Sequence, residues 1–342
     1  MILSITLDRK KGGIANSLIS YSKALDLIGE KHFIILPNDA AAKDDLLNLP
    51  NVQIFSIKKS SLYFHLLTRF IFKRDYKNHI EDSKWIFIHN SKLINFFNQY
   101  SFKLGMINHS GKLRNTLHRA FNIFLTHAGY ERFISHYPDN ESTNLVIPHG
   151  FDKLSEAFSL KKNKVLKVIS AGRFVTKKAF NDLIKAAEKL QRDNFPVQIE
   201  LFGSGPLEAE LRKKINDQAL KNIRLIGWTE DLHNEFRKAD VFCITSLEEP
   251  FGLIIGEAMM SGLPVISTQT DGAMEIFGTE PEKKGAIYVD FSSPDEIKNA
   301  IQALSNDEKR LLLAQNAHDN INTNFSLERL SRKLKDLFEY AD

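Results

Sequence analysis

The chain has 342 residues, of which 43% are hydrophobic and 26% are charged. This length exceeds what one hydrophobic core usually covers, so we predict two domains, and the composition excludes a largely disordered chain. No stretch reaches the roughly 20 apolar residues that cross a bilayer, and the N-terminal sequence MILSITLDRKKGG lacks the features of a signal peptide. The single cysteine, Cys243, can form no internal disulfide, so we expect a cytoplasmic protein.

Charge is distributed unevenly along the chain. Residues 1–150 contain 19 Lys and Arg against 12 Asp and Glu, whereas the remainder contains 27 against 30. A basic N-terminal half suits an anionic membrane surface or a phosphate-bearing acceptor. Nucleic acid is the competing interpretation, but the sequence contains no recognisable nucleic-acid-binding motif, so we predict no nucleic-acid partner.

Short apolar runs rich in β-branched residues alternate with segments of helical period along both halves of the chain. The predicted strands of the first half are ILSITL, HFIIL, VQIF, WIFIH, GMINH, IFLT and LVIP. Those of the second half are VLKVIS, VQIELF, IRLIG, VFCIT, PVIST and AIYV. This alternation predicts an α/β protein of two doubly wound, Rossmann-like domains facing a cleft, with the ligand at the carboxyl ends of the strands.

The pattern also predicts the domain boundaries. We place an acceptor-side domain at residues 1–150 and a nucleotide-sugar-binding domain at residues 164–322. Between them, residues 151–163 contain turn residues and a charge cluster without a sustained apolar period, which is typical of a linker. Residues 323–342 have apolar positions three and four apart, so we expect a helix that packs back on the first domain.

The most informative motif is SLEEPFGLIIGEAMMSGLPVIST, which follows the predicted strand VFCIT. Seven residues separate Glu249 from Glu257, and a helix is predicted to begin near Leu253 and to end before Gly262. Both carboxylates and the first N–H groups of that helix should face one cavity. Carboxylates accept hydrogen bonds from sugar hydroxyls and helix-end amides bind phosphate, so a sugar nucleotide fits; two solvated glutamates are the alternative.

A second motif, SAGRFVTKKAFND, connects the strand VLKVIS to a predicted helix. Arg173 and Lys178 stand on this connection, where two cations can converge on one diphosphate beside a helix N-terminus. Lys177 is the alternative to Lys178, and we favour Lys178.

A third motif, FGSGPLEAEL, places Gly203 and Gly205 directly after the strand VQIELF. It matches half of a dinucleotide-binding fingerprint, but Glu208 replaces the third glycine, so an NAD-dependent enzyme is disfavoured. Further on, Trp228 lies either near a nucleobase or in the core as a structural residue.

Together these motifs resemble the retaining GT-B glycosyltransferases of family GT4, also called glycosyl transferases group 1. In this resemblance EEPFGLIIGEA corresponds to the family's EX7E element. It implies that Glu249 contacts the donor sugar and Glu257 the ribose hydroxyls. It also implies backbone contacts to the donor from Phe251, Gly252 and Leu253.

The same resemblance assigns the other motifs of the second domain. It implies that Arg173 and Lys178 bind the donor diphosphate and that the loop at Gly203 lies on the nucleotide side. The segment around Trp228 resembles the one that borders the base. Ala179 stands where the family usually has glycine.

In the first domain, the loop DRKKGG leads into a helical segment, and the resemblance implies that Gly13 lies beside the diphosphate and the acceptor. His89 and His109 each end an apolar strand, and His109 resembles the family's histidine near the transferred sugar. A structural role is the alternative for both. LVIPHGFD resembles the family's IPNGVD, with His149 replacing asparagine and altering a local turn.

We therefore expect a retaining glycosyltransferase that moves a hexose-like sugar from a nucleotide diphosphate donor, UDP-sugar being favoured, to a hydroxyl acceptor. The expected pathway is the synthesis of a cell-surface polysaccharide, a lipopolysaccharide or a lipid-linked glycan. The catalytic residues expected are Glu249, Arg173, Lys178 and His109. Two cations and helix dipoles can cover the diphosphate and the chain has no Asp-x-Asp pair, so we expect no metal ion and no cofactor.

Three other functions remain open from the sequence. They are a sugar-nucleotide epimerase of the same architecture, an NAD-dependent oxidoreductase, and a non-catalytic nucleotide-sugar-binding protein.

Residues 57–77 interleave aromatic residues with six Lys and Arg. They form either an interfacial helix, which would place the protein at the inner face of the membrane, or a core-facing helix with a basic rim.

Overall fold

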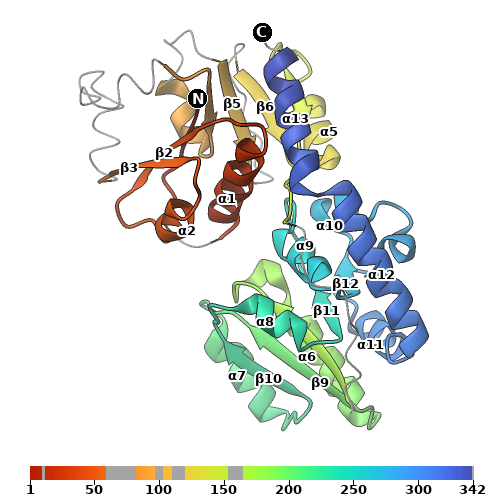
Figure 1. The fold of residues 1–342 in the computed structure, drawn as a ribbon. Helices are drawn as coiled ribbons and strands as arrows, with labels where there is room; N and C mark the ends of the chain where they lie inside the picture. The colour runs from red at the N-terminus through yellow and green to blue at the C-terminus, as the bar shows by residue number, and fades with distance from the viewer. Residues whose placement is uncertain (10–11, 59–81, 97–102, 110–119, 153–164, 341–342) are drawn as a thin grey trace. The chain divides into compact units, whose positions relative to one another are not determined.

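The computed structural model describes all residues except 10–11, 59–81, 97–102, 110–119, 153–164 and 341–342. The chain folds as two compact units (Figure 1). Unit 1 comprises Met1–Gly150 and Phe325–Asp342, and unit 2 comprises Phe151–Asn324. Most of the predicted linker 151–163 and nearly all of the segment 57–77 lie outside the described residues.

Unit 1 is built on a parallel sheet with the strand order β3-β2-β1-β4-β5-β6-β7. The strands are β1 (Ile2–Ile5), β2 (His32–Pro37), β3 (Val52–Ile57), β4 (Trp85–Ile88), β5 (Lys103–Asn108), β6 (Ala120–Phe124) and β7 (Asn144–Val146). Each of them overlaps one of the predicted apolar runs, although β6 and β7 begin before the runs IFLT and LVIP. Central strands of a sheet covered by helices are buried on both faces, which explains why these runs are continuous and do not alternate with polar residues.

Helices of unit 1 cover this sheet. They are α1 (Gly13–Asp26), α2 (Lys43–Leu47), α5 (His127–His136) and α13 (Leu327–Tyr340), with a 3-10 helix at Ser91–Phe96. Although α13 comes from the far end of the chain, it packs on α1. Its leucines Leu330, Leu334 and Leu337 are buried, and the ring of Phe338 lies 5.6 Å from that of Trp85. The last helix therefore completes the core of unit 1.

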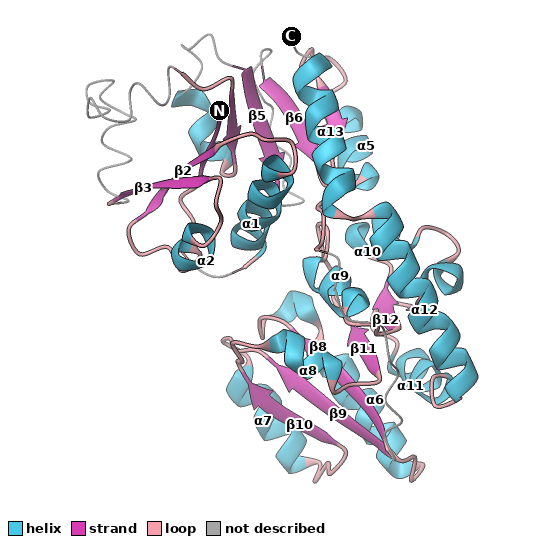
Figure 2. Ribbon diagram, in the orientation of Figure 1, coloured by secondary structure: helices cyan, strands magenta, loops and turns pink. Residues whose placement is uncertain are grey.

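Unit 2 is built on a second parallel sheet with the order β10-β9-β8-β11-β12-β13 (Figure 2). The strands are β8 (Leu166–Ala171), β9 (Val197–Phe202), β10 (Ile223–Gly227), β11 (Val241–Ile244), β12 (Val265–Thr268) and β13 (Ala286–Val289). The helices are α6 (Phe180–Arg192), α7 (Glu208–Asp217), α8 (Leu232–Arg237), α9 (Leu253–Met260), α10 (Asp271–Phe277), α11 (Pro294–Ala303) and α12 (Asp307–Asn324), with 3-10 helices at Thr176–Lys178 and Pro281–Lys284. Both sheets are doubly wound, so the predicted fold class is confirmed.

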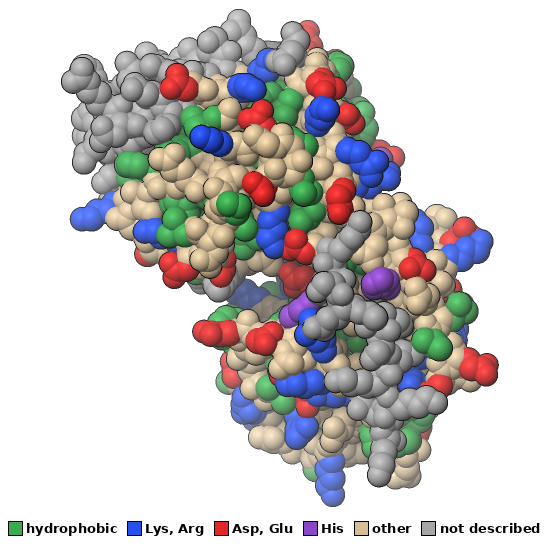
Figure 3. Space-filling model, viewed as in Figure 1, with side chains coloured by type: hydrophobic (Ala, Val, Ile, Leu, Met, Phe, Trp, Pro, Cys, Tyr) green, Lys and Arg blue, Asp and Glu red, His purple; other side chains and the backbone are tan. Residues whose placement is uncertain are grey.

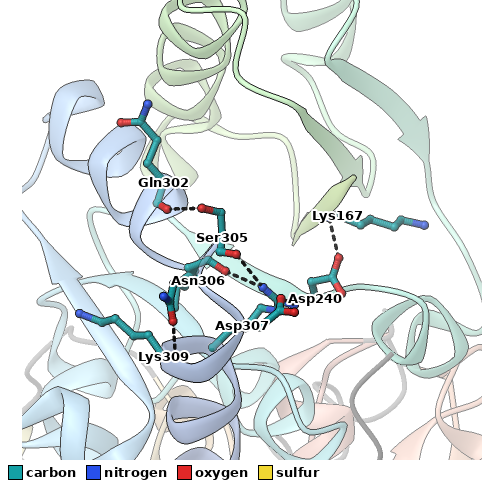
Figure 4. A network of polar contacts seen from close by, with 9 residues as sticks. Lys167, Asp240, Gln302, Ser305, Asn306, Asp307 and Lys309 are labelled. Atoms are coloured by element: carbon teal, nitrogen blue, oxygen red, sulfur yellow. Dashed lines mark hydrogen bonds and ion pairs between the residues drawn. The ribbon is translucent and has the colours of Figure 1, made fainter. Parts of the chain in front are cut away.

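Buried polar groups of unit 2 also serve the fold at positions away from the carboxyl ends of the strands (Figure 4). At the start of β8, the amide of Lys167 donates to Oδ2 of Asp240 at 2.7 Å. Near the start of α12, the guanidinium of Arg310, which is 4% exposed, donates to the carbonyl of Leu304 at 2.9 Å and to Asp307 at 2.6 Å. These contacts fix element ends and leave the opposite sheet edge for ligand chemistry.

On the face drawn in Figure 3, basic and acidic side chains are interspersed over both units. The excess of basic residues in 1–150 therefore gathers into no single patch among the described residues of this face. No described helix is both long and apolar enough to cross a membrane.

Candidate functional site

The candidate site lies in unit 2, at the carboxyl ends of β8 and β11. These strands pair in parallel, with Val168 beside Val241, so both chains leave the sheet at the same edge. The strand order also reverses between them, because β9 and β10 follow β8 on one side and β12 and β13 follow β11 on the other. Ligands of open α/β sheets bind at such a reversal, at the carboxyl ends of the strands.

Two predicted site residues meet at this edge. The Nζ atom of Lys178, in the 3-10 helix after β8, forms an ion pair with Oε1 of Glu249, in the loop after β11. The hydroxyl of Ser246 donates to the same oxygen at 2.8 Å. The side chains of Lys178 and Glu249 are 15% and 10% exposed, so the pair is shielded from bulk water without being sealed from it.

Further hydrogen bonds hold the two loops together. The hydroxyl of Thr245 lies 3.1 Å from the carbonyl oxygens of both Lys178 and Ala179. The amide of Leu247 donates to the carbonyl of Lys177 at 2.8 Å. Of the two adjacent lysines, Lys178 carries the side chain that reaches Glu249, whereas the side chain of Lys177 is exposed. Arg173, at the beginning of the same connection, is also exposed.

Ala179 has the backbone conformation in which glycine is the favoured residue. Its φ is 47° and its ψ is 35°, which is the left-handed region, at the junction between the 3-10 helix and α6. A side chain costs energy there and glycine does not, so glycine is the favoured residue at this junction. Alanine, the smallest side chain, still allows the turn that places Lys178 beside Glu249.

The glycines of FGSGP are required by the packing of backbone on backbone. A Cβ atom on Gly203, whose φ is +139°, would lie 1.9 Å from the carbonyl oxygen of Gly172. A Cβ on Gly205 would lie 2.5 Å from the carbonyl oxygen of Phe174. The loop after β9 thus lies directly against the loop that carries Arg173. This close packing explains why glycine stands at both positions, so no dinucleotide-binding role is needed to explain them.

Helix α9 begins where the sequence predicts. Gly252 has a φ of +78°, and the helix starts at Leu253, so the first N–H groups of α9 follow Glu249 by only a few residues. Phe251 is 2% exposed and anchors this loop in the core. The carbonyl of Glu249 accepts a hydrogen bond from the amide of Gly272 at 2.8 Å. The backbone of the loop is therefore held in place, and the carboxylate of Glu249 is held by the side chains of Lys178 and Ser246.

The remaining predicted residues of unit 2 lie at or near the same edge. Glu257 is in the second turn of α9 and is half-buried. Trp228 directly follows β10 and is 59% exposed, so the interpretation as a buried structural tryptophan is wrong. Its proximity to a nucleobase stays a prediction.

In unit 1, Gly13 is the first residue of α1, as predicted, and Gly12 precedes it. A Cβ atom on either glycine would meet nothing within 4 Å, so packing among the described residues does not require glycine at these positions. Their role beside a ligand stays a prediction.

The histidines that were predicted separately form one cluster in unit 1. His89 is 3% exposed, and its Nδ1 lies 2.9 Å from Nε2 of His109. His109 directly follows β5 and is half-buried. The ring of His149, which is 2% exposed, lies 6.0 Å from that of His109. No sequence pattern indicated this contact, because the three residues come from different strand ends. His149 was expected only to alter a turn.

Burial keeps this cluster uncharged near neutral pH. It lowers the pKa of His109 to about 4. Burial also lowers the pKa of His89 well below its usual value, and repulsion from the neighbouring histidines adds to this effect. The pKa of His149 is lowered in the same way. In the part of the chain that the structure describes, no group of three or more His, Cys, Asp or Glu side chains is arranged to hold a metal ion.

Comparison with known proteins finds a family that the second unit resembles. Residues 152–320 match the family model described as glycosyl transferases group 1. The lipopolysaccharide core biosynthesis glycosyltransferase LpsE of Rhizobium meliloti is 30% identical over 166 residues, which cover 48% of this chain and 47% of LpsE. The chain spans about half the length of the curated relatives that it matches.

Solved structures resemble the chain over nearly its whole length. HepE of Anabaena, in complex with UDP-glucose, superposes with a TM-score of 0.79 at 19% identity, covering 99% of both chains. Sucrose-phosphate synthase of Thermosynechococcus elongatus superposes with a TM-score of 0.80 at 18% identity, covering 99% of this chain and 98% of that enzyme. The two Rossmann-like units are therefore those of the GT-B fold.

Proposed function

We propose that this protein is a retaining glycosyltransferase of family GT4 that transfers a hexose-like sugar from a nucleotide diphosphate donor, a UDP-sugar, to a hydroxyl acceptor. The observation that carries the proposal is the ion pair between Lys178 and Glu249 at the start of α9. It places a cation, a carboxylate and free helical N–H groups at one sheet edge, which are the groups that a diphosphate and a sugar need.

Each residue has a proposed role in this site. Arg173 and Lys178 bind the diphosphate, and their charge stabilises it as it leaves. Glu249 accepts hydrogen bonds from the donor sugar, and Glu257 accepts them from the ribose. The backbone of Gly252 and Leu253 contributes N–H groups to the donor.

Other residues have proposed roles in recognition. The loop at Gly203 borders the nucleotide, and Trp228 lies beside the base. Phe251 holds the loop that carries Glu249. In unit 1, Gly13 allows close approach of a ligand to the start of α1, and His109 contacts a sugar hydroxyl.

The proposed chemistry relies on positioning and charge stabilisation. The acceptor hydroxyl attacks the anomeric carbon on the face from which the diphosphate departs, so the new bond keeps the original configuration. The acceptor's proton passes to a departing phosphate oxygen. Arg173, Lys178 and the amides of α9 offset the charge that develops on the diphosphate, so the reaction needs no metal ion.

The comparisons support a pathway as well as a reaction class. A lipopolysaccharide core enzyme is among the relatives, and HepE was solved with UDP-glucose. We propose that this protein acts in the cytoplasm on a cell-surface polysaccharide or lipid-linked glycan. Peripheral contact with the inner face of the membrane through residues 57–77 is part of the proposal and falls on a segment outside the described residues.

The decisive experiment has two stages. Thermal-shift measurements with UDP, GDP and ADP and their sugars identify the donor, since a ligand at about 100 times its Kd stabilises the fold by about 2.7 kcal/mol. The stabilising sugar nucleotide is then incubated with a hydroxyl acceptor in excess EDTA, and NMR gives the anomeric configuration of the product. We expect a retained configuration in EDTA. Donor conversion without an acceptor would indicate an epimerase, and binding without turnover would indicate a binding protein.

A further inference from the structure

A chain of hydrogen bonds crosses the centre of unit 1 and ends at His109. Ser22 of α1 lies 2.7 Å from Nδ1 of His32 in β2. Nε2 of His32 lies 2.7 Å from the hydroxyl of Ser4 in β1. That hydroxyl lies 3.4 Å from Nε2 of His89, and Nδ1 of His89 lies 2.9 Å from Nε2 of His109. The chain thus runs across four adjacent strands, from β2 through β1 and β4 to β5.

The direction of every bond in this chain follows from its first member. The hydroxyl of Ser22 lies 2.8 Å from the carbonyl oxygen of Leu18, and only the hydroxyl hydrogen can lie between these two oxygens. Ser22 therefore has no hydrogen left for His32, so Nδ1 of His32 must be the donor. Burial lowers the pKa of His32 to about 3, so the ring is neutral and its Nε2 carries only a lone pair.

The same reasoning continues along the chain. Because Nε2 of His32 accepts, the hydroxyl of Ser4 must donate to it, and the oxygen of Ser4 is left to accept from Nε2 of His89. A neutral ring with its hydrogen on Nε2 has a bare Nδ1, so His89 accepts a hydrogen bond from Nε2 of His109. His109 is then the tautomer with hydrogen on Nε2 and a lone pair on Nδ1.

The packing around the chain holds this arrangement in place. Ser4, Ser22, His32 and His89 are each at most 3% exposed. Tyr21 packs with its ring edge-on to His89, at a centroid distance of 6.2 Å. The rings of His89 and His109 lie within 17° of parallel, which is compatible with a hydrogen bond in the planes of both rings. Nδ1 of His109 has no hydrogen-bond partner among the described residues.

We propose that Ser22, His32, Ser4 and His89 are positioning residues that fix His109 in one tautomer, so that its Nδ1 acts as a hydrogen-bond acceptor for substrate. The group that it recognises must carry a hydrogen, as a sugar hydroxyl does. Phosphate and carbonyl oxygens, which have only lone pairs, are disfavoured at this position. This specificity rests on the proposed function, whereas the tautomer itself does not.

The tautomer can be measured without any substrate. In protein labelled with ¹⁵N-histidine, two-bond ¹H–¹⁵N correlations distinguish protonated from bare ring nitrogens, and His109→Gln identifies the signals of His109 among the 11 histidines. We expect a bare Nδ1 on His109 at neutral pH. Ser4→Ala removes the hydroxyl that links His32 to His89 in the chain of hydrogen bonds. The tautomer of His109 with its hydrogen on Nδ1 should then become populated.

A matched control separates the chain from packing in general. Ser17 is also a fully buried serine of unit 1, and its hydroxyl has no hydrogen-bond partner among the residues that the structure describes. Ser17→Ala should leave the His109 spectrum unchanged. A protonated Nδ1 on His109 in the natural protein, or an identical spectrum in Ser4→Ala, would overturn the proposal.

Kinetics test the link to substrate. Ser4→Ala should lower kcat/KM about fivefold, the effect of about one lost hydrogen bond, whereas Ser17→Ala should not. Equal kcat/KM values despite a changed tautomer would refute the substrate contact. If the natural protein turns over no sugar nucleotide, the proposed function fails while the spectra still decide the tautomer.

Discussion

Lys178 and Glu249 form an ion pair although they stand 71 positions apart in the sequence. The lysine follows β8 and the glutamate follows β11, so their contact exists only because these two strands are neighbours in the sheet. The carboxylate offsets part of the lysine's charge at the position where we propose that a diphosphate binds. We therefore expect the charge of Glu249 to affect how tightly the nucleoside diphosphate binds.

Glu249→Gln should strengthen binding of the free nucleoside diphosphate while lowering kcat for transfer. The amide keeps a similar shape but no longer neutralises Lys178, and about 1 kcal/mol of added attraction corresponds to about fivefold in Kd. Titration calorimetry at low and high salt checks this, since screening should reduce the gain. Glu248→Gln changes the exposed neighbour and should alter neither quantity. Weaker binding in Glu249→Gln would mean that the carboxylate orients Lys178 and does not compete with phosphate.

Arg173→Ala should lower kcat more than it raises KM. Negative charge on the diphosphate grows as the sugar bond lengthens, so a guanidinium contact strengthens toward the transition state, and its loss should cost about 10² to 10³ in kcat. Arg173→Lys should recover part of the loss, because it keeps the charge but not the planar fork. Lys177→Ala, an exposed cation on the same connection, serves as the control. A near-normal kcat in folded Arg173→Ala would remove the phosphate role.

Glu257→Ala should mainly raise KM. Contacts to the ribose are equally strong in the ground state and the transition state, so their loss weakens donor binding without slowing the chemical step. Steady-state kinetics over a range of donor concentrations measure both constants. If kcat falls instead while KM holds, Glu257 and not Glu249 lies beside the reacting sugar.

Gly203→Ala should destabilise unit 2 more than Gly227→Ala does. Both glycines have positive φ, at +139° and +104°, so both variants carry backbone strain of about 1–2 kcal/mol. Only Gly203 also faces a backbone oxygen 1.9 Å from the new Cβ, whereas a Cβ on Gly227 would meet nothing within 4 Å. In urea unfolding, Gly203→Ala should therefore lose about 1–3 kcal/mol more of its free energy of unfolding than Gly227→Ala does. Equal losses would show that the loop after β9 can move away from Gly172.

Acid should destabilise unit 1 steeply below about pH 6.5, where histidines of the unfolded chain become protonated. The folded-state pKa values of His32 and His109 are lowered to about 3 and about 4, so between these values and 6.5 the unfolded state binds more protons. Stability is therefore present above the unfolded pKa and is lost as the pH falls, by about 1.4 kcal/mol per pH unit for each such histidine.

Tryptophan fluorescence can follow this loss in unit 1 alone. The chain has two tryptophans, and Trp228→Phe leaves Trp85, which is 1% exposed, as the reporter of unit 1. Urea midpoints from pH 7 to pH 5 then give the slope. His32→Asn removes one of the groups that bind a proton on unfolding, so it should reduce the slope of stability against pH by the contribution of one histidine. An unchanged slope would contradict the assignment of His32 as a buried neutral group.

The sequence was sufficient to predict the fold because both sheets are made of mainly apolar runs, and every described strand overlaps one of them. It also indicated Lys178 and Glu249 as site residues, since both stand on connections after strands. It could not indicate their contact, which depends on strand order. The histidine chain was missed for a different reason: Ser4 and His32 are polar residues inside apolar strands, and a single sequence does not distinguish a satisfied pair from two isolated residues.

The packing of α13 on α1 has a consequence for synthesis of the protein. The sheet of unit 1 is translated before unit 2, yet Leu330, Leu334 and Leu337, which complete its core, are translated after unit 2. Unit 2 comes from one continuous segment and can finish folding while unit 1 still exposes the apolar face that awaits α13. Truncation before Leu327 should therefore leave unit 2 intact and make unit 1 prone to aggregation and to capture by chaperones.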